Sequence, residues 1–174
     1  MISTVHPAFG YIIVKQQIPA NTVINNDPAV DNIYTVTDVS KFGQTTDGFI
    51  WLYTFGQTKI TNIYTGEIQL RNPGYCNLVT PEKIGTFKKE IVEDAVIFCL
   101  SGRTNDKKLP LPTLQYFSLT AGSKTELNPN TKLFLADGSI TVDDQTFAGP
   151  KQIKVGDIAK EIIANTQCYG YIFP

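Results

Sequence analysis

The stretch GTFKKEIVED (Gly85–Asp94) is matched further along the chain by GDIAKEIIAN (Gly156–Asn165). Counted from the glycine, both stretches have lysine at position +4, glutamate at +5 and isoleucine at +6. Both then have a β-branched residue at +7 and Asp or Asn at +9. This many matches in one alignment predict an internal repeat, and the repeat decides how the rest of the chain is divided.

Further matches flank these two stretches. Gly66–Leu70 aligns with Gly138–Val142, and Tyr53–Lys59 resembles Leu119–Lys124. Each copy then closes on an apolar, aromatic run, of which Ala95–Leu100 is the first. The second closing run is Tyr169–Phe173. We therefore expect two units of related fold.

The repeat sets the predicted domain boundaries. A stretch rich in turn formers, charges and prolines separates the two copies and is typical of an exposed linker. The region before the first copy stands outside the repeat and offers strands at Phe9–Gln16 and Asn32–Val39. The expected division is an N-terminal strand-bearing arm (1–48), a first β unit (49–100), a linker (101–114) and a second β unit (115–174).

The local sequence pattern predicts an all-β fold. Short alternating or β-rich runs such as Phe49–Phe55 and Lys132–Leu135 follow one another, with turn signals between them, as in a sandwich or barrel. Residues 86–100 differ, because apolar side chains recur there every four positions, as on a helix face. We expect strands there too, with a helical turn within residues 86–95 as the alternative.

Composition narrows the class of protein. Hydrophobic residues make up 42% of the 174 residues, charged residues 18%, and the net charge is −1. Such a chain buries a proper core, which excludes a disordered protein. No basic field is present to attract nucleic acid or an anionic membrane. No apolar run approaches the roughly 20 residues of a membrane-spanning helix.

Cysteine and histidine are scarce. Cys76, Cys99 and Cys168 lie far apart and form no C-x-x-C pair, which argues against a disulfide framework and a structural zinc site. Cys99 lies in an apolar run, so we expect a buried, inert thiol there. The single histidine, His6, stands beside Pro7 in a segment expected to be exposed. Mechanisms that need a histidine pair or a triad therefore have one poorly placed candidate.

The second unit resembles a cupin, a small jelly-roll barrel. Leu119–Gly122, continued by Leu133–Val142, is similar to the first cupin motif, in which a strand enters a metal loop and leaves through a glycine step. Val155-Gly156-Asp157-Ile158 resembles the turn that opens the second motif, and Ile163–Gln167 resembles the turn after it. Because the first unit matches the second, the resemblance implies a jelly-roll fold for both, as in a compact bicupin.

The metal ligands of cupins are missing. The resemblance places the H-x-H pair at Asn128-Pro129-Asn130 and the third histidine near Ala159 or Lys160. Asn and Pro are poor metal ligands and Ala is none, so we expect no metal and no other cofactor. A metal-free cupin epimerase would still need a base, and His6 lies outside both repeats.

The remaining polar clusters favour structural roles. Asp143-Asp144 suits a hairpin tip better than a carboxylate pair for acid–base work or calcium. The Glu90, Glu93 and Asp94 cluster, next to two lysines, suits a face of alternating charge better than catalysis. We therefore expect no catalytic residue among them.

Two further features invite a functional interpretation. The pairs Lys89/Glu90 and Lys160/Glu161 recur in both copies, and they suit ion pairs between units or subunits. Trp51, Tyr53 and Phe55 alternate on one expected strand. Core or interface positions explain these aromatic residues, with carbohydrate stacking as the alternative.

Two kinds of function stay open at this stage. With few charges, one methionine and many apolar and aromatic residues, the chain resembles bacteriophage virion proteins in composition. We expect a non-enzymatic structural protein of the virion, a head (capsid) decoration or tail accessory component. It would act as a homo-oligomer that docks on other virion proteins. The alternative is a metal-free, cupin-like protein that binds or isomerises a small molecule or carbohydrate.

Overall fold

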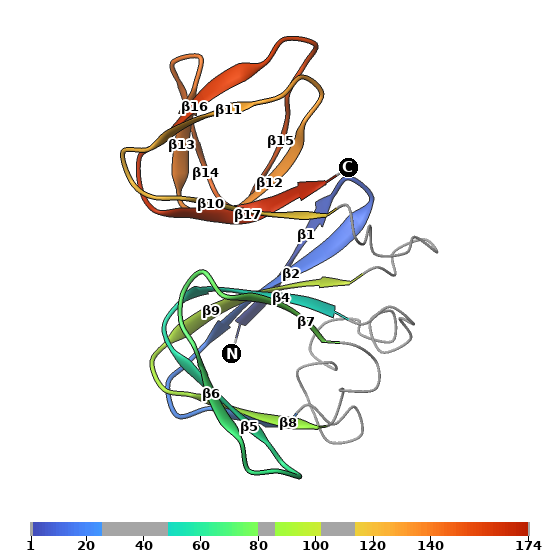
Figure 1. Cartoon of the computed structure of the whole chain (residues 1–174), viewed down its shortest axis with the longest axis vertical. Helices are drawn as coiled ribbons and strands as arrows, with labels where there is room; N and C mark the ends of the chain where they lie inside the picture. Colours follow the sequence, from blue (N-terminus) through green and yellow to red (C-terminus); the bar gives the residue numbers. More distant parts are fainter. Residues whose placement is uncertain (1, 26–48, 80–85, 102–113, 174) are drawn as a thin grey trace. The chain divides into compact units, whose positions relative to one another are not determined.

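The computed structural model describes residues 2–25, 49–79, 86–101 and 114–173. The chain divides into two compact units, Met1–Leu109 and Pro110–Pro174. Every regular element within the described residues is a β-strand, so the expected all-β class is confirmed (Figure 1). No helix in these ranges is long and apolar enough to cross a membrane.

The second unit is an eight-stranded jelly roll. One sheet has the order β10-β17-β12-β15 and the other the order β11-β16-β13-β14, all antiparallel. This is two interleaved Greek keys, the arrangement of cupins. Its strands are β10 (Gln115–Leu119), β11 (Lys124–Leu127), β12 (Lys132–Asp137), β13 (Ser139–Val142), β14 (Gln145–Ala148), β15 (Lys151–Lys154), β16 (Lys160–Ala164) and β17 (Cys168–Phe173).

Within the described residues, the first unit repeats this topology with one extra strand. Its sheets have the orders β1-β2-β9-β4-β7 and β3-β8-β5-β6. With β1 set aside, strands β2–β9 correspond one by one to β10–β17. The strands are β1 (Ile2–Ala8), β2 (Tyr11–Ile18), β3 (Val23–Asn25), β4 (Phe49–Phe55), β5 (Thr58–Asn62), β6 (Ile68–Arg71), β7 (Cys76–Val79), β8 (Phe87–Ile91) and β9 (Ala95–Ser101).

Matching irregularities fix which residues correspond. The β4–β9 pairing shifts register between Tyr53 and Phe55, and the β12–β17 pairing shifts between Leu135 and Asp137. The next residue in each unit is a glycine with positive φ, Gly56 (73°) and Gly138 (99°). A bulge followed by the same tight turn therefore aligns Tyr53 with Leu135. The expected repeat is confirmed as two copies of one jelly roll.

The alignment made from sequence needs correction in detail. Ile91 N donates to Thr22 O in the first unit, and Ala164 N donates to Ser123 O in the second. These equivalent bonds align Ile91 with Ala164, two positions away from Ile162, which the sequence match had paired with it. Lys89 therefore corresponds to Ile162 and not to Lys160.

The flanking matches shift as well. Strand β6 (Ile68–Arg71), which contains most of the Gly66–Leu70 stretch, corresponds to β14 and not to β13. Residues 53–59 run from β4 into β5 and correspond to the β12–β13 turn, not to residues 119–124. The glycines and apolar residues of neighbouring hairpins are similar enough for sequence comparison to align the wrong pair.

The structure also assigns the N-terminal residues differently from the expected arm. Strand β2 pairs with β9 from Ile12↔Ser101 to Ile18↔Ala95, and β1 pairs with β2 along its other edge. The first unit is incomplete without β2 and β3, so residues 2–25 belong to its sheets. The expected strand at Asn32–Val39 lies outside the described residues, as does almost all of the expected linker at 101–114.

Residues 86–100 form two strands, as expected. Strand β8 ends at Ile91, a turn follows, and β9 begins at Ala95. The alternative of a helical turn within residues 86–95 is therefore wrong. The recurrence of apolar residues every four positions arises because two inward-facing strand patterns are joined by a three-residue turn.

Candidate ligand-binding site in the first unit

The interior face of the larger sheet of the first unit carries two rows of side chains. The pairings Val14↔Cys99 and Trp51↔Cys99 make one row across β2, β9 and β4. Gln16↔Ile97 and Tyr53↔Ile97 make the next row. All members of the two rows are buried, because they line the interior of the jelly roll.

The facing sheet adds two more pairs to the interior. Thr58 lies opposite Ile91, and Ile60 lies opposite Lys89, on neighbouring strands β5 and β8. Thr58 and Lys89 are buried, as are their partners. Among the described residues, the interior of this unit therefore includes the polar side chains of Gln16, Tyr53, Thr58 and Lys89.

Lys89 is the centre of this polar set. Its side chain is 2% exposed, and its Nζ lies 3.5 Å from the centroid of the Trp51 ring and 5.8 Å from that of Tyr53. An ammonium group over an aromatic face is attracted by the negative charge of the π system. The two rings thus partly compensate the loss of water around this buried cation.

The second unit has an apolar residue at each equivalent position. The equivalent residues, all buried, are Phe117 for Gln16, Leu135 for Tyr53, Ile140 for Thr58 and Ile162 for Lys89. Leu133 also replaces Trp51. Burying polar groups and a charge disfavours folding, whereas aliphatic side chains stabilise the same fold. The polar set is therefore not needed to build the jelly roll.

Two of the polar atoms in the first unit have hydrogen-bonding capacity left. Gln16 Oε1 and Thr58 Oγ1 are buried, and neither makes a hydrogen bond within the part of the chain that the structure describes. Buried polar atoms of this kind are rare in native interiors and call for a partner. They give the interior an acceptor and a hydroxyl group in addition to the cation of Lys89.

Aromatic contacts continue from the interior to the edge of the unit. Tyr53 packs edge-to-face on Tyr75, with ring centroids 6.2 Å apart, and Arg71 Cζ lies 4.0 Å from the centroid of Tyr75. Tyr75 is 39% exposed. A series of contacts therefore links the buried Lys89 to an exposed rim made by Arg71 and Tyr75.

Burial alters the acidity of two neighbouring groups. Desolvation raises the pKa of Cys99 to about 12, although the nearby Lys89 charge acts in the opposite direction. Desolvation also raises the pKa of Tyr53, while the Arg71 charge lowers it. Both groups are neutral at physiological pH, so Cys99 is the buried thiol expected from sequence and is no nucleophile.

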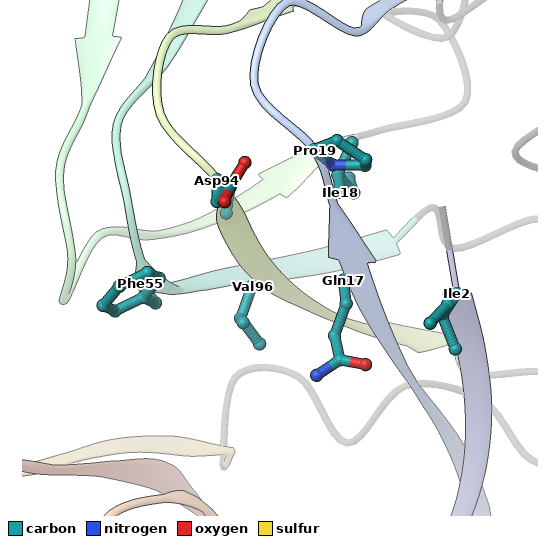
Figure 2. A pocket seen from close by; sticks show the side chains of 8 residues that line it. Ile2, Gln17, Ile18, Pro19, Phe55, Asp94 and Val96 are labelled. Atoms are coloured by element: carbon teal, nitrogen blue, oxygen red, sulfur yellow. The ribbon is translucent and has the colours of Figure 1, made fainter.

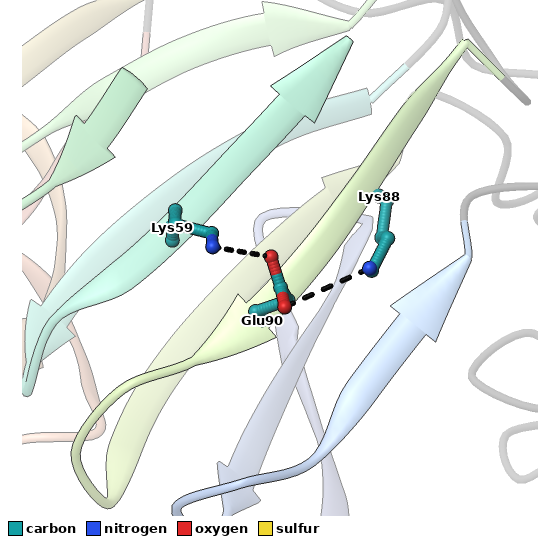
Figure 3. A network of polar contacts seen from close by, with 3 residues as sticks. All are labelled: Lys59, Lys88 and Glu90. Carbon is teal, nitrogen blue, oxygen red and sulfur yellow. Dashed lines mark ion pairs between the residues drawn. The ribbon is translucent and has the colours of Figure 1, made fainter. Parts of the chain in front are cut away.

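The acidic cluster is divided among separate structural roles. Glu90 forms two ion pairs on the outer side of the sheet (Figure 3). Its Oε2 lies 2.8 Å from Lys59 Nζ, and its Oε1 lies 3.6 Å from Lys88 Nζ. The hydrogen bond from Lys59 holds the pKa of Glu90 below its usual range. Asp94 Oδ1 accepts a hydrogen bond from Ala20 N at 2.8 Å, and Glu93 is exposed. Of the three acidic residues, only Glu90 lies on a charged strand face, because Glu93 and Asp94 lie in the turn between β8 and β9. Lys89, next to Glu90, points inward.

An external pocket lies on the opposite side of the larger sheet. It encloses about 480 Å³, and Figure 2 shows Gln17 and Val96 near its centre and Phe55 at one side. Phe55 is 58% exposed because the bulge after Tyr53 breaks the alternation that sequence had continued from Trp51. The pocket is lined by Ile2, Gln17, Ile18, Pro19, Phe55, Asp94, Ala95 and Val96.

The candidate residues of the second unit form turns and surface pairs. Asp143 and Asp144 have φ of 48° and 60° and connect β13 to β14, the expected hairpin tip. Lys160 Nζ lies 2.6 Å from Asp143 Oδ2, and Glu161 is exposed. Asn128-Pro129-Asn130 forms the turn between β11 and β12.

His6 and the other two cysteines lie away from the polar interior. His6 is half-buried on β1, where its Nε2 lies 3.0 Å from Thr4 Oγ1. Burial, followed by the charge of Lys15, lowers its pKa. The thiols of Cys76 and Cys168 are free. None of these residues joins the Lys89 set.

The metal that the cupin resemblance implies does not fit these interiors. The second unit offers aliphatic side chains, and in the first unit the Lys89 charge would repel a bound cation. Among the described residues, no three His, Cys, Asp or Glu side chains are grouped so as to hold a metal ion. We therefore derive no chemistry through a metal.

Sequence reasoning missed Gln16, Thr58 and the inward direction of Lys89. A signal was present for two of them. Lys89 shares the two-residue alternation of Phe87 and Ile91, and Gln16 shares that of Val14 and Ile18. A polar residue within an inward-facing alternation indicates a buried polar position.

Comparisons with solved structures agree with the topology. HutD from Pseudomonas fluorescens SBW25 matches with a TM-score of 0.54 and 7% identity, over 94% of this chain and 79% of that one. GK1651 from Geobacillus kaustophilus matches with a TM-score of 0.53 and 10% identity, over 98% of this chain and 86% of that one. YhhW from Escherichia coli matches with a TM-score of 0.53 and 9% identity, over 97% of this chain and 85% of that one. No family model and no curated protein sequence matches the chain.

These likenesses, at such low identity, concern the fold alone. Together with the strand order they define a class, the two-unit proteins of cupin-like jelly-roll fold. In this chain the two interiors differ, because buried polar side chains are present in the first unit where the second has apolar ones.

Proposed function

We propose that this protein is a metal-free, cupin-like small-molecule-binding protein whose ligand site is the interior of the first unit. The observation that carries this proposal is the difference between the two interiors. Four buried polar side chains in one unit are replaced by Phe, Leu and Ile in the other. Since the apolar version builds the same fold, the polar version favours a role other than stability.

The chemistry of the set suits binding. Lys89 supplies a cation, Gln16 Oε1 an acceptor and Thr58 a hydroxyl, while Trp51 and Tyr53 offer aromatic faces. Ligand sites in proteins commonly combine apolar walls with a few converging polar groups of this kind. Among the described residues of this interior, Cys99 and Tyr53 are held neutral, so neither is a general base at physiological pH. We therefore keep binding without catalysis as the proposal.

Trp51 makes the proposal directly testable, because it is the only tryptophan in the sequence and contacts Lys89. We would titrate the full chain with three hydroxy acids (lactate, mandelate, galacturonate) and three neutral counterparts (lactamide, mandelamide, galactose). The readouts are Trp51 emission and isothermal calorimetry. A saturable change with at least one compound, acid or neutral, supports the proposal.

A matched pair of variants locates the binding. Gln16→Leu removes an interior polar group of the first unit, and Phe117→Leu changes the equivalent position of the second. Loss of one hydrogen bond to a ligand should weaken binding about tenfold in Gln16→Leu and leave Phe117→Leu unchanged. If no compound binds, or if both variants behave like the wild type, the proposal is wrong.

A second candidate is the protein-docking role expected from composition. The observation that favours it is a group of exposed apolar side chains on the β5–β6 hairpin: Ile63, Tyr64, Ile68 and Leu70. Contiguous exposed apolar surface is typical of protein interfaces. The virion location, the homo-oligomer and the absence of enzymatic activity stay predictions.

Light scattering after size-exclusion chromatography tests this candidate. A wild-type oligomer that becomes a monomer in the Ile68→Asp/Leu70→Asp variant would support docking through the hairpin. A wild-type monomer would leave no homo-oligomer to explain and would count against this role.

A further inference from the structure

Strand β6 forms one edge of the smaller sheet of the first unit. Within the described residues it pairs with β5 alone, from Thr58↔Arg71 to Thr61↔Ile68, without a bulge. An unpaired strand edge is a template for another strand, and proteins commonly block it with proline, lysine or a bulge. The sequence of β6, IQLR, contains neither proline nor lysine. The edge is therefore suited to pairing with a further strand.

The hydrogen bonds of the β5–β6 hairpin show which backbone groups face this edge. Asn62 N donates to Glu67 O at 2.9 Å, so these two residues form a hydrogen-bonded pair. In an antiparallel ladder such pairs alternate with pairs whose N–H and C=O groups point away from each other. Counted from Glu67, the backbone N–H and C=O groups of Ile68 and Leu70 therefore point away from β5. Two donors and two acceptors thus face the edge.

The residues along this edge are self-complementary. They read Glu67-Ile68-Gln69-Leu70-Arg71, with an acid at one end, a base at the other and two apolar residues between them. In a second copy that runs antiparallel, with the two Gln69 residues opposite each other, Ile68 lies opposite Leu70. The edge-facing groups of these two residues then form four backbone hydrogen bonds. On the other face of the joined sheet, Glu67 lies opposite Arg71 twice.

Neighbouring registers lack this match. The edge-facing backbone groups also meet when Ile68 lies opposite Ile68, or when Leu70 lies opposite Leu70. The first of these registers places Glu67 opposite Gln69, and the second places Arg71 opposite Gln69. Neither brings opposite charges together, so the charges select the register centred on Gln69.

Both charged groups have capacity for this pairing. Glu67 and Arg71 form no ion pair within the described residues. Glu67 is exposed, and its Oε1 accepts a hydrogen bond from Gln69 Nε2 at 2.9 Å. The guanidinium of Arg71 stacks on the ring of Tyr75, with Cζ 4.0 Å from the centroid. A stacked guanidinium keeps its N–H donors in its own plane, where a carboxylate can accept from them.

The apolar residues of the edge lie on the outer face of the sheet. Ile68 and Leu70 are each more than half exposed. In the second unit Thr146 corresponds to Leu70, because it pairs with Thr141 as Leu70 pairs with Lys59. A polar residue at this position builds the same hairpin, so the fold does not require the exposed leucine. In the paired arrangement the apolar residues of the two copies lie side by side.

We propose that β6 pairs antiparallel with β6 of a second copy of this chain, centred on Gln69, so that two four-stranded sheets join into one. This inference rests on the docking role, the second candidate function, and does not depend on ligand binding. A two-fold axis between the Gln69 residues makes the contact isologous and closes it at two copies. Because a four-residue strand gives a small interface, the dimer is weak and concentration-dependent.

A charge exchange tests the register. Glu67→Arg places two positive charges opposite each other at both ends of the pairing, and Arg71→Glu places two negative charges there. In sedimentation velocity runs over a concentration series, each variant alone should dimerise at least about tenfold more weakly than the wild type. An equimolar mixture of the two variants should dimerise like the wild type, because every residue 67 then faces an opposite charge at position 71.

A pair of proline variants tests the backbone hydrogen bonds. Leu70→Pro removes an N–H group that points away from β5, so it should abolish the dimer and leave the chain folded. Thr146→Pro is the matched control in the second unit. Its N–H also points away from the neighbouring strand, because Val142 and Gln145 flank a two-residue hairpin turn. This variant should dimerise like the wild type, and circular dichroism melting establishes that both variants are folded.

The contradicting results separate this inference from the docking role. A wild-type dimer that Ile68→Asp/Leu70→Asp breaks, but that each charge variant alone leaves intact, would overturn the register while docking through the hairpin stands. A mixture of the charge variants that dimerises no better than its components would do the same. A dimer that Thr146→Pro breaks and Leu70→Pro does not would place the contact in the second unit. A wild-type monomer throughout the concentration series would overturn both the pairing and the docking role.

Discussion

Lys89 of the first unit and Ile162 of the second occupy the same position in two copies of one jelly roll. Lys89 lies two residues before Ile91, and Ile162 lies two residues before Ala164, the residue aligned with Ile91. Both side chains are buried. One position thus accepts either a charge or an aliphatic side chain without a change of topology. What differs is the surroundings, because Leu133 stands in the second unit where Trp51 contacts Lys89 in the first.

The first prediction removes the charge at position 89 and introduces one at position 162. Lys89→Met should raise the free energy of unfolding by about 1 kcal/mol, since an apolar residue replaces a buried charge. Ile162→Lys should lower it by about 3 kcal/mol or more, because no aromatic ring there compensates the ammonium. Urea denaturation monitored by circular dichroism measures both changes. A strongly destabilised Lys89→Met would instead make Lys89 a structural residue.

The second prediction concerns the contact between Lys89 and Trp51. In a double-mutant cycle of Lys89→Met and Trp51→Leu, the coupling free energy should be about 0.5–2 kcal/mol, the usual range for a cation over an aromatic ring. The cycle is measured by urea denaturation followed by circular dichroism, because one variant lacks the fluorophore. Additive effects of the two substitutions would contradict the contact.

The third prediction tests the shared turn after the bulge. A Cβ on Gly56 would meet the carbonyl oxygen of Asp94, and one on Gly138 would meet that of Gln167 at 2.5 Å, both at positive φ. Gly56→Ala and Gly138→Ala should each cost about 3 kcal/mol, from backbone strain plus the clash.

Gly66 provides the control for this turn. It also has positive φ but no atom within 4 Å of an added Cβ, so Gly66→Ala should cost only about 1 kcal/mol. Thermal or urea unfolding compares the three variants. Equal effects at all three glycines would contradict the close approach of Gly56 to Asp94 and of Gly138 to Gln167.

The fourth prediction concerns pH. Lys59 lowers the pKa of Glu90 from its ordinary value of 4.5, so folding favours the ionised carboxylate. Its stabilising effect is fully present above pH 4.5 and is lost as the pH falls through the lowered folded value. The melting temperature of wild type minus that of Glu90→Gln should therefore be larger at pH 7 than at pH 3. In 1 M NaCl the difference in melting temperature at pH 7 should shrink, because salt screens the ion pairs. A difference that changes with neither pH nor salt would contradict a stabilising role of these ion pairs.

Sequence reasoning found the fold class because strand alternation and turn residues are local signals. It misaligned the copies at Lys89 for a physical reason. A shift of two residues leaves every side chain on the same face of a strand, so the match of Lys89 with half-buried Lys160 preserved a plausible alternation of inward and outward positions. Backbone hydrogen bonds to Thr22 and Ser123 reveal the true alignment, and no local pattern reports them.

The role of the N-terminal residues was beyond prediction for a different reason. Strand β2 pairs with β9, which lies far along the chain, and nothing in either strand specifies that partner. The polar interior of the first unit follows from the same pairing, since it brings Gln16 into line with Tyr53 across Ile97. Alternation can show that Gln16 points inward, but only the sheet order shows what it faces.

The most direct measurement for the ligand site is a crystal structure of the full chain with the tightest-binding compound of the six. We expect density for the compound inside the first unit, beside Trp51. Density in the second unit, density in the external pocket beside Phe55 and Val96, or no density at a saturating concentration would contradict it.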